Sequence, residues 1–284
     1  MAVRPKTLWA AVAPVLMGTA MAYGGGGFHA VSACCALVGA VLIQVGANFA
    51  NDYFDHVKGA DTPDRLGPTR VTQTGLVSPQ TMRWAMALTF LLACIPGLYI
   101  VVRGGWVFVV IGVASILCAV LYTAGPYPLG YLGLGDVFVL VFFGPVAVGG
   151  TYYVQALDIS ADVLLAGVAA GLFSVAILTV NNLRDVEQDR RAGKRTLPVR
   201  FGRTFAKAEY IGALLVGGLA IPAALALRSG HVGAVLSAAV LPAAVPTVRT
   251  VLTRADGPTL NRALGATGKL LLVFALLFSV GWLL

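Results

Sequence analysis

The sequence predicts an all-α protein, a polytopic bundle of membrane-spanning helices. Of its 284 residues, 58% are hydrophobic and only 11% are charged, whereas about a quarter of the residues in a soluble domain are charged. Glycine is abundant, with 34 residues, as in transmembrane helices that pack closely through small side chains. Apolar runs of roughly twenty residues recur. The strand alternation of an outer-membrane barrel is absent, so a helical bundle is the predicted architecture.

About nine apolar segments are long enough to cross a membrane, which predicts about nine transmembrane helices. Short turns that contain Gly or Pro separate several of them. The first segment follows Arg4 and Lys6 like a signal peptide, but it has no convincing cleavage site, so we expect a retained helix. The predicted segments are 8–24, 30–50, 82–102, 105–123, 134–154, 161–182, 207–227, 231–248 and 265–284.

The positive charges indicate how the bundle is oriented. With the N-terminus in the cytoplasm, all of the 20 Lys and Arg residues except Arg103 and Arg228 fall in or beside cytoplasmic segments. Lys and Arg are enriched in the cytoplasmic loops of membrane proteins. We therefore predict a multi-pass protein of the cell inner (cytoplasmic) membrane, surrounded by membrane lipids. The net charge of +8 then reflects topology, and we expect no nucleic-acid partner.

A first acidic and amide-rich stretch, 48–70, interrupts the apolar pattern at the end of the second predicted helix. Four of its residues stand at the helical spacing i, i+3, i+4 and i+7 and can share one face: Asn48, Asn51, Asp52 and Asp55. Such oxygen ligands suit Mg²⁺, which proteins typically hold through one or two carboxylates together with substrate phosphates. The basic residues that follow can meet those phosphates, and they are Lys58, Arg65 and Arg70.

A second stretch, 181–203, repeats this organisation. Asn182, Asp185 and Asp189 can share a helical face, and the chain then turns strongly basic, with Lys194 and Arg195. Asp and Asn also occur as helix caps and in solvated loops, which would explain either stretch alone. The recurrence favours a shared metal-diphosphate site on the cytoplasmic side. It also suggests an internal duplication within a single domain, 1–284.

Two further polar residues lie near predicted helix ends. Tyr122 could contact substrate or stabilise a cation through its ring, or it could serve as an interfacial anchor. Asp136 opens the fifth segment, where an acid complements the helix dipole, so we interpret it as a cap rather than a catalytic group.

The acidic motifs, together with the nine-helix pattern, resemble the UbiA superfamily of intramembrane prenyltransferases. The motifs that carry this resemblance are Asn51-Asp-Tyr-Phe-Asp55 and Asn182-Leu-Arg-Asp185-x-x-x-Asp189. Within the superfamily, the runs 59–79 and 181–202 and the N-terminal Arg4-Pro-Lys-Thr7 closely resemble bacterial 1,4-dihydroxy-2-naphthoate polyprenyltransferases. The similarity extends over nearly the whole chain.

The resemblance implies a Mg²⁺-dependent prenyltransferase that moves a polyprenyl group from polyprenyl diphosphate to 1,4-dihydroxy-2-naphthoate. The acceptor loses its carboxyl group and yields demethylmenaquinone, a step of menaquinone biosynthesis. By position, the implied catalytic residues are Asn51, Asp55, Asp185 and Asp189. The implied metal set is the same four residues with Asp52 and Asp61 in support. The expected substrate-binding residues are Asn48, Lys58, Arg65, Arg70, Tyr122, Asn182, Lys194 and Arg195.

Two other functions remain open at this stage. The enzyme could prenylate another aromatic or lipid acceptor, because the motifs that hold a diphosphate say little about the second substrate. A secondary transporter would also combine internal repeats with polar residues inside the membrane. The acids here cluster at one membrane face and are followed by bases suited to phosphate, an arrangement that fits poorly with alternating access.

Overall fold

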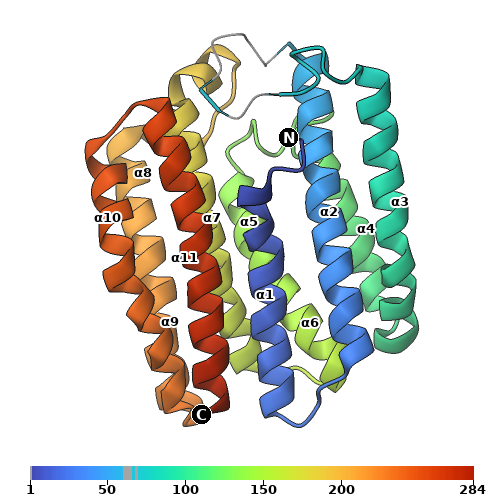
Figure 1. Ribbon diagram of the computed structural model, residues 1–284, viewed down its shortest axis with the longest axis vertical. Coiled ribbons are helices and arrows are strands. Elements are labelled where there is room, and N and C mark those ends of the chain that lie inside the picture. Colours follow the sequence, from blue (N-terminus) through green and yellow to red (C-terminus); the bar gives the residue numbers. More distant parts are fainter. Residues whose placement is uncertain (1, 60–65, 68–69) are drawn as a thin grey trace.

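In the computed structural model, the described residues (2–59, 66–67 and 70–284) form helices joined by turns, without strands. The helices run roughly parallel along the long axis of the molecule (Figure 1). Five rods are single helices over nearly their whole length: α1 (Pro5–Gly24), α2 (Ala30–Val57), α3 (Pro79–Gly104), α7 (Ala161–Arg191) and α11 (Gly257–Leu283). The shorter α4 spans Val107–Leu121.

Three more rods change their helical winding along their length. The first consists of α5 (Gly135–Val141), the π-helical turn η1 (Phe142–Val146) and α6 (Ala147–Ala156). The second consists of α8 (Leu197–Leu215), η2 (Val216–Ala220) and α9 (Ile221–Ser229). The third joins the 3₁₀ segment η3 (Val232–Ala239) to α10 (Val240–Thr253).

Eight rods among the described residues are long and apolar enough to cross a membrane, and α4 is a shorter apolar helix. Each of the predicted apolar segments coincides with one of these rods or extends beyond it by at most two residues at an end, so the predicted helical membrane bundle is confirmed. At 15 residues, α4 is about 22 Å long. The predicted count therefore differs from the number of full-length spans only at this helix.

Several helices begin where the sequence supplies a capping side chain. Ser78, Ser160 and Asp256 each accept a hydrogen bond from the backbone N–H three residues later, at the starts of α3, α7 and α11. Such side chains satisfy an N–H group that has no partner within the helix. The local sequence therefore determines where these helices start.

The rod from α5 to α6 bends at Gly144 and Pro145. Gly144 has the non-helical angles φ −110° and ψ −111°, and the proline after it cannot donate a backbone hydrogen bond. The bend lies against two glycines of α7, since a Cβ atom on Gly167 would come within 2.7 Å of the Pro145 Cα. This close approach of two backbones is typical of membrane helices that pack through small residues.

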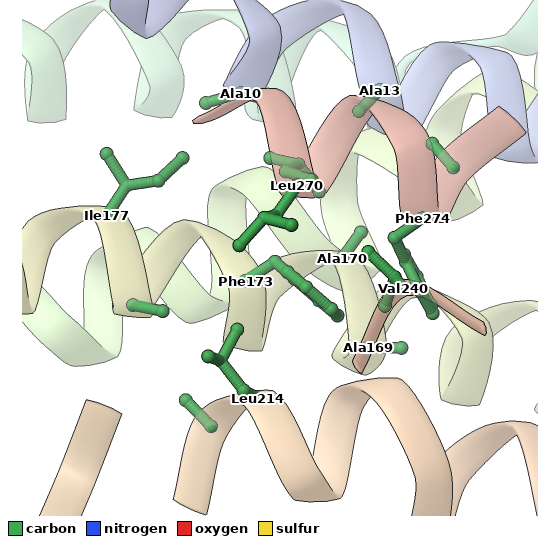
Figure 2. Close-up of a cluster of buried hydrophobic side chains, with 14 of the residues drawn as sticks. Ala10, Ala13, Ala169, Ala170, Phe173, Ile177, Leu214, Val240, Leu270 and Phe274 are labelled. Carbon is green, nitrogen blue, oxygen red and sulfur yellow. The ribbon is translucent and has the colours of Figure 1, made fainter. Parts of the chain in front are cut away.

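The apolar core lies around α7. Phe173 of α7 stacks on Phe274 of α11 with ring centroids 4.5 Å apart. Small side chains of α1, such as Ala10 and Ala13, pack in the same cluster as Leu214 of α8 (Figure 2). Large apolar side chains also cover the outside of the bundle, as expected for a surface that faces lipid.

The longest helices carry the two acidic motifs. α7 has 31 residues and α2 has 28, and their carboxyl-terminal ends lie at the same end of the bundle, the upper end in Figure 1. The N-terminus lies beside the upper part of α2 in the same view. This arrangement brings segments that are distant in sequence to one end of the molecule.

Candidate active site

The acidic ends of α2 and α7 line a single cavity. α2 contributes Asn51 and Asp55, one turn apart, and α7 contributes Asn182, Asp185 and Asp189. The other predicted residues in its wall are Arg70, Tyr122 and Lys194. Residues that the sequence analysis did not assign to the site complete the lining: Arg4, Thr123, Gly130, Tyr131, Asn181, Gln188, Ala192 and Thr196.

One base from each basic tail lies beside the carboxylate of Asp55. The Arg70 Nη2 atom lies 2.5 Å from Asp55 Oδ2, and the Lys194 Nζ atom lies 3.4 Å from Asp55 Oδ1. Lys194 also lies 3.9 Å from Asp189 Oδ1, so it bridges the two acidic helices. A buried carboxylate is strongly unfavourable unless it is paired. The bases that follow each motif therefore keep the acidic cavity neutralised.

Asp185 is held by its neighbour in the chain. Arg184 donates from Nε to Asp185 Oδ1 at 2.7 Å and from Nη2 to Oδ2 at 2.5 Å, a two-point contact that fixes the plane of the carboxylate. The same guanidinium donates to Asn181 Oδ1 at 2.9 Å and to Asn261 Oδ1 of α11 at 3.3 Å. Arg184 is only 2% exposed. Its sequence signal is an arginine that closely follows the apolar run 161–182, where an ionisable residue is usually functional.

Tyr122 occupies a slot between two glycines. A Cβ atom on Gly135 would come within 2.7 Å of the Tyr122 hydroxyl oxygen, and one on Gly130 would come within 2.8 Å of its ring. Burial raises the pKa of Tyr122, and the negative charges of Asp136, Asp189 and Asp55 raise it further. The hydroxyl therefore stays protonated at neutral pH and can donate a hydrogen bond into the cavity.

The loop after α4 contributes two further contacts. The Thr123 hydroxyl donates to Asn51 Oδ1 at 2.5 Å, which orients the first amide of the motif. The ring of Tyr131 lies between two ammonium groups, 5.0 Å from Lys58 Nζ and 4.9 Å from Lys194 Nζ. Both distances are typical of cation–π contacts. Neither Thr123 nor Tyr131 has a local sequence signal, because the fold alone brings this loop to the motifs.

Lys58 lies at the edge of this cluster. Its ammonium donates to the Gly125 carbonyl at 2.9 Å and does not line the cavity. Partial burial lowers the pKa of Lys58, the charge of Lys194 lowers it further, and Asp55 opposes the shift.

Five other predicted residues also lie outside the cavity wall or outside the described residues. Asn48 donates to the Val3 carbonyl at 2.9 Å, and Asp52 accepts from the Thr72 N–H at 3.3 Å. The Arg195 backbone N–H donates to the Tyr131 carbonyl, while its side chain is exposed. Asp61 and Arg65 fall outside the described residues.

The ionic side chains that line the cavity are balanced in sign. The carboxylates of Asp55, Asp185 and Asp189 are matched in number by the basic groups of Arg4, Arg70 and Lys194. No three acidic, His or Cys side chains of the described residues converge into a metal-binding group. The oxygen donors suit a hard cation that takes most of its ligands from phosphate and water, rather than an all-protein cage.

The fold and this cavity define a polytopic membrane protein that can hold a charged head group at one end of a helical bundle. The sequence pattern of the UbiA prenyltransferase family matches residues 11–278. The chain belongs to the UbiA prenyltransferase family.

Individual relatives agree with this assignment. The chain is 41% identical to 1,4-dihydroxy-2-naphthoate octaprenyltransferase of Escherichia coli over 98% of its own length and 92% of that protein. It is 40% identical to the protein of the same name from Mycobacterium tuberculosis, over 96% of its length and 92% of that protein. A UbiA homolog from Archaeoglobus fulgidus bound to DMAPP and Mg²⁺ has the same fold, with a TM-score of 0.66, 15% identity and 98% coverage of both chains.

Proposed function

We propose that this protein transfers a polyprenyl group from polyprenyl diphosphate to 1,4-dihydroxy-2-naphthoate, with loss of the acceptor's carboxyl group. The product is demethylmenaquinone, so the reaction belongs to menaquinone biosynthesis. The observation that carries the proposal is the single cavity into which α2 and α7 project their acidic ends. The relatives at 41% and 40% identity, both named as octaprenyltransferases of this acceptor, support the choice of substrates.

The donor's head group fits the charges of this cavity. Asn51, Asp55, Asp185 and Asp189 would hold Mg²⁺ together with phosphate oxygens. Mg²⁺ bound there would neutralise the departing diphosphate and so favour cleavage of the allylic carbon–oxygen bond. Arg70 and Lys194 supply charge-assisted hydrogen bonds to the diphosphate. Asp52, which accepts from the Thr72 N–H, supports the segment that carries Arg70.

The apolar tail of the donor is better solvated by lipid than by water, so we propose that it leaves the cavity among the membrane-spanning helices. Tyr122 contributes a protonated hydroxyl and a ring face in the cavity wall. Its ring can stabilise positive charge that develops on the allylic carbon.

We also propose that the N-terminus and both acidic motifs face the cytoplasm, where a soluble acceptor can reach them. Arg103 and Arg228 lie at the opposite end of the bundle, where Arg228 pairs with Asp162 at 3.2 Å. A cysteine introduced in place of Arg190 should react with a membrane-impermeant maleimide only in inverted vesicles, and one in place of Asp158 only in intact cells. The reverse labelling would overturn the orientation. That the two motifs belong to duplicated halves of one domain stays a prediction.

The direct test is a transfer assay on detergent-purified protein with labelled polyprenyl diphosphate and 1,4-dihydroxy-2-naphthoate. We expect a lipid-soluble, decarboxylated product with Mg²⁺ and none with excess EDTA. Asp185→Asn should abolish product formation, whereas Asp162→Asn, a carboxylate at the far end of the bundle, should leave it unchanged. Diphosphate release without a naphthoate adduct would point to another acceptor. Near-normal turnover by folded Asp185→Asn protein would refute the proposed site.

A further inference from the structure

The packed helices α1 and α11 carry a basic patch on their outer surface, which consists of Lys6 of α1 with Arg262 and Lys269 of α11. All three side chains are exposed, and the two helices lie side by side (Figure 1). None of these three residues lines the cavity of the acidic motifs. The basic patch is therefore a charged feature that the proposed reaction does not use.

The two lysines of the patch converge on one glycine. A Cβ atom on Gly265 would meet the Lys6 side chain, 3.2 Å from its Cδ and 3.5 Å from its Cε, so Lys6 lies across α11 at this position. Lys269 stands four residues after Gly265, and side chains on a helix point back toward its N-terminus. The Lys269 ammonium is thereby directed toward the turn that Lys6 crosses. Gly265 has no side chain to separate the two charges.

No acidic side chain of the described residues compensates these charges. Neither α1 nor α11 contains Asp or Glu, and no ion pair within the described part of the chain involves Lys6 or Lys269. Arg262 donates to the neutral Thr259 hydroxyl at 3.2 Å. Like charges at one turn repel each other, and an anion placed between them removes this repulsion. The basic patch is therefore complementary to an anion.

The patch lies at the depth of a membrane interface. α1 has 20 residues and is about 30 Å long, which matches the hydrocarbon core of a bilayer, and Lys6 stands in its first turn. A Cβ atom on Gly268 would lie 2.8 Å from the Lys6 carbonyl oxygen, so the backbone of Lys269 is at the same level. Lysine side chains at this depth extend to the polar headgroup layer. Both ammonium groups can therefore reach lipid phosphates.

Beyond the patch, α11 continues as an apolar stripe toward its C-terminus. Val273, Leu276 and Val280 follow Lys269 at intervals of four, three and four residues, which keep them on one face of the helix. Their side chains are between 41% and 53% exposed. An acyl chain can lie along this stripe while the phosphate of the same lipid meets the lysines. The basic patch and the stripe together fit a lipid better than a soluble phosphate.

We propose that Lys6 and Lys269 bind the phosphate of one anionic phospholipid, whose acyl chain lies along the apolar stripe of α11. Basic residues between transmembrane helices bind such head groups through charge-assisted contacts. Arg262 adds positive charge at the edge of the patch. Because the two lysines come from different helices, the bound lipid links the start of α1 to α11. The inference does not depend on the proposed reaction.

Native mass spectrometry of the purified full-length protein in a neutral detergent tests this proposal. The probes are dioleoylphosphatidylglycerol and dioleoylphosphatidylcholine, which share their acyl chains and differ in net charge. One basic residue near a membrane surface contributes about fivefold to the affinity for an anionic lipid. The wild-type protein should therefore bind one phosphatidylglycerol roughly 25-fold more tightly than phosphatidylcholine. Lys6→Gln and Lys269→Gln should each lower this preference about fivefold, and the double variant should lose it.

Two controls separate the patch from the general positive charge at this end of the molecule. Arg249→Gln removes an exposed charge of α10 outside the patch and should leave the preference unchanged. Gly265→Leu keeps every charge but fills the space that Lys6 crosses, so it should lower the preference. Gly212→Leu, at a position where a Cβ atom meets nothing within 4 Å, should have no effect.

Equal affinity of the wild-type protein for the two lipids would overturn the inference. So would a preference that survives in the double variant, or one that Arg249→Gln lowers as much as Lys269→Gln does. Displacement of the bound phosphatidylglycerol by glycerol 3-phosphate would assign the patch to soluble phosphates. Displacement by an equimolar amount of polyprenyl diphosphate would assign it to the donor, and either displacement would contradict a phospholipid site.

Discussion

Lys194 and Asp55 lie 3.4 Å apart between Nζ and Oδ1, although 139 positions separate them in the chain. The lysine follows the second acidic motif, and the aspartate belongs to the first. The pair therefore couples the two motifs. Asp55 and Asp189 rely on bases that the diphosphate would also attract.

This coupling predicts that a divalent metal and diphosphate bind together. Mg²⁺ alone would be repelled by the positive charges of Arg70 and Lys194. Pyrophosphate alone would be repelled by the carboxylates. We expect the two together to stabilise the purified protein by about 2.7 kcal/mol at a hundredfold excess over Kd, and either alone to give much less. Thermal unfolding in detergent measures this effect, and Asp55→Asn should abolish it. Equal stabilisation by Mg²⁺ alone would contradict the coupling.

Arg184 should be essential for both stability and transfer. Removing one partner of a buried ion pair leaves the other charge uncompensated, at a cost of about 3 kcal/mol. Arg184→Gln should therefore lower the melting temperature and abolish product formation, because Asp185 loses its fixed orientation. The control is Arg190→Gln on the same helix, whose partner is Glu187 and whose side chain is 57% exposed. If both variants behaved alike, the assigned role of Arg184 would be wrong.

The slot around Tyr122 predicts that Gly135→Ala and Tyr122→Phe have non-additive effects on kcat/KM. Gly135→Ala would place a methyl group 2.7 Å from the Tyr122 hydroxyl oxygen, so the ring must shift and kcat/KM should fall. Tyr122→Phe removes that oxygen, and the nearest ring carbon is then 3.4 Å away, an ordinary contact. Gly135→Ala should therefore cost much less in the Phe background.

The four-member kinetic cycle measures this coupling directly. The control Gly112→Ala lies on α4, where a Cβ atom meets nothing within 4 Å. Its kcat/KM should match that of the wild-type protein. An equal loss from Gly135→Ala in the Tyr and Phe backgrounds would exclude the slot.

At the opposite end of the bundle, Gly281 of α11 should be required for stability but not for the chemistry. A Cβ atom there would clash with the Gly233 carbonyl oxygen of η3, so the two backbones would have to separate. Such overpacking costs roughly 1–3 kcal/mol. Gly281→Ala should lower the melting temperature, with turnover per folded molecule unchanged. Gly212→Ala, where a Cβ atom meets nothing within 4 Å, should behave like the wild-type protein.

The helices could be predicted from local sequence because their signals are local. An apolar run such as 161–182 is unfavourable in water whatever lies elsewhere in the chain. Ser160 caps α7 by accepting a hydrogen bond from the backbone N–H of Val163, only three residues later. The spacing of Asn51 and Asp55 likewise ensures that they occupy adjacent turns of one face. The membrane bundle and the pairing of acidic helix ends follow from such patterns.

What each side chain meets depended on the tertiary structure. Asn48 and Asp52 stand at the same helical spacing as the cavity pair, yet one contacts the segment before α1 and the other the Thr72 N–H. Helical periodicity assigns a face but not the neighbour that covers it. Arg4 and Thr123 reach the cavity through chain segments remote from both motifs. Helix packing brings them close to the motifs. Because this packing depends on many weak contacts throughout the bundle, it cannot be predicted from a short stretch of sequence.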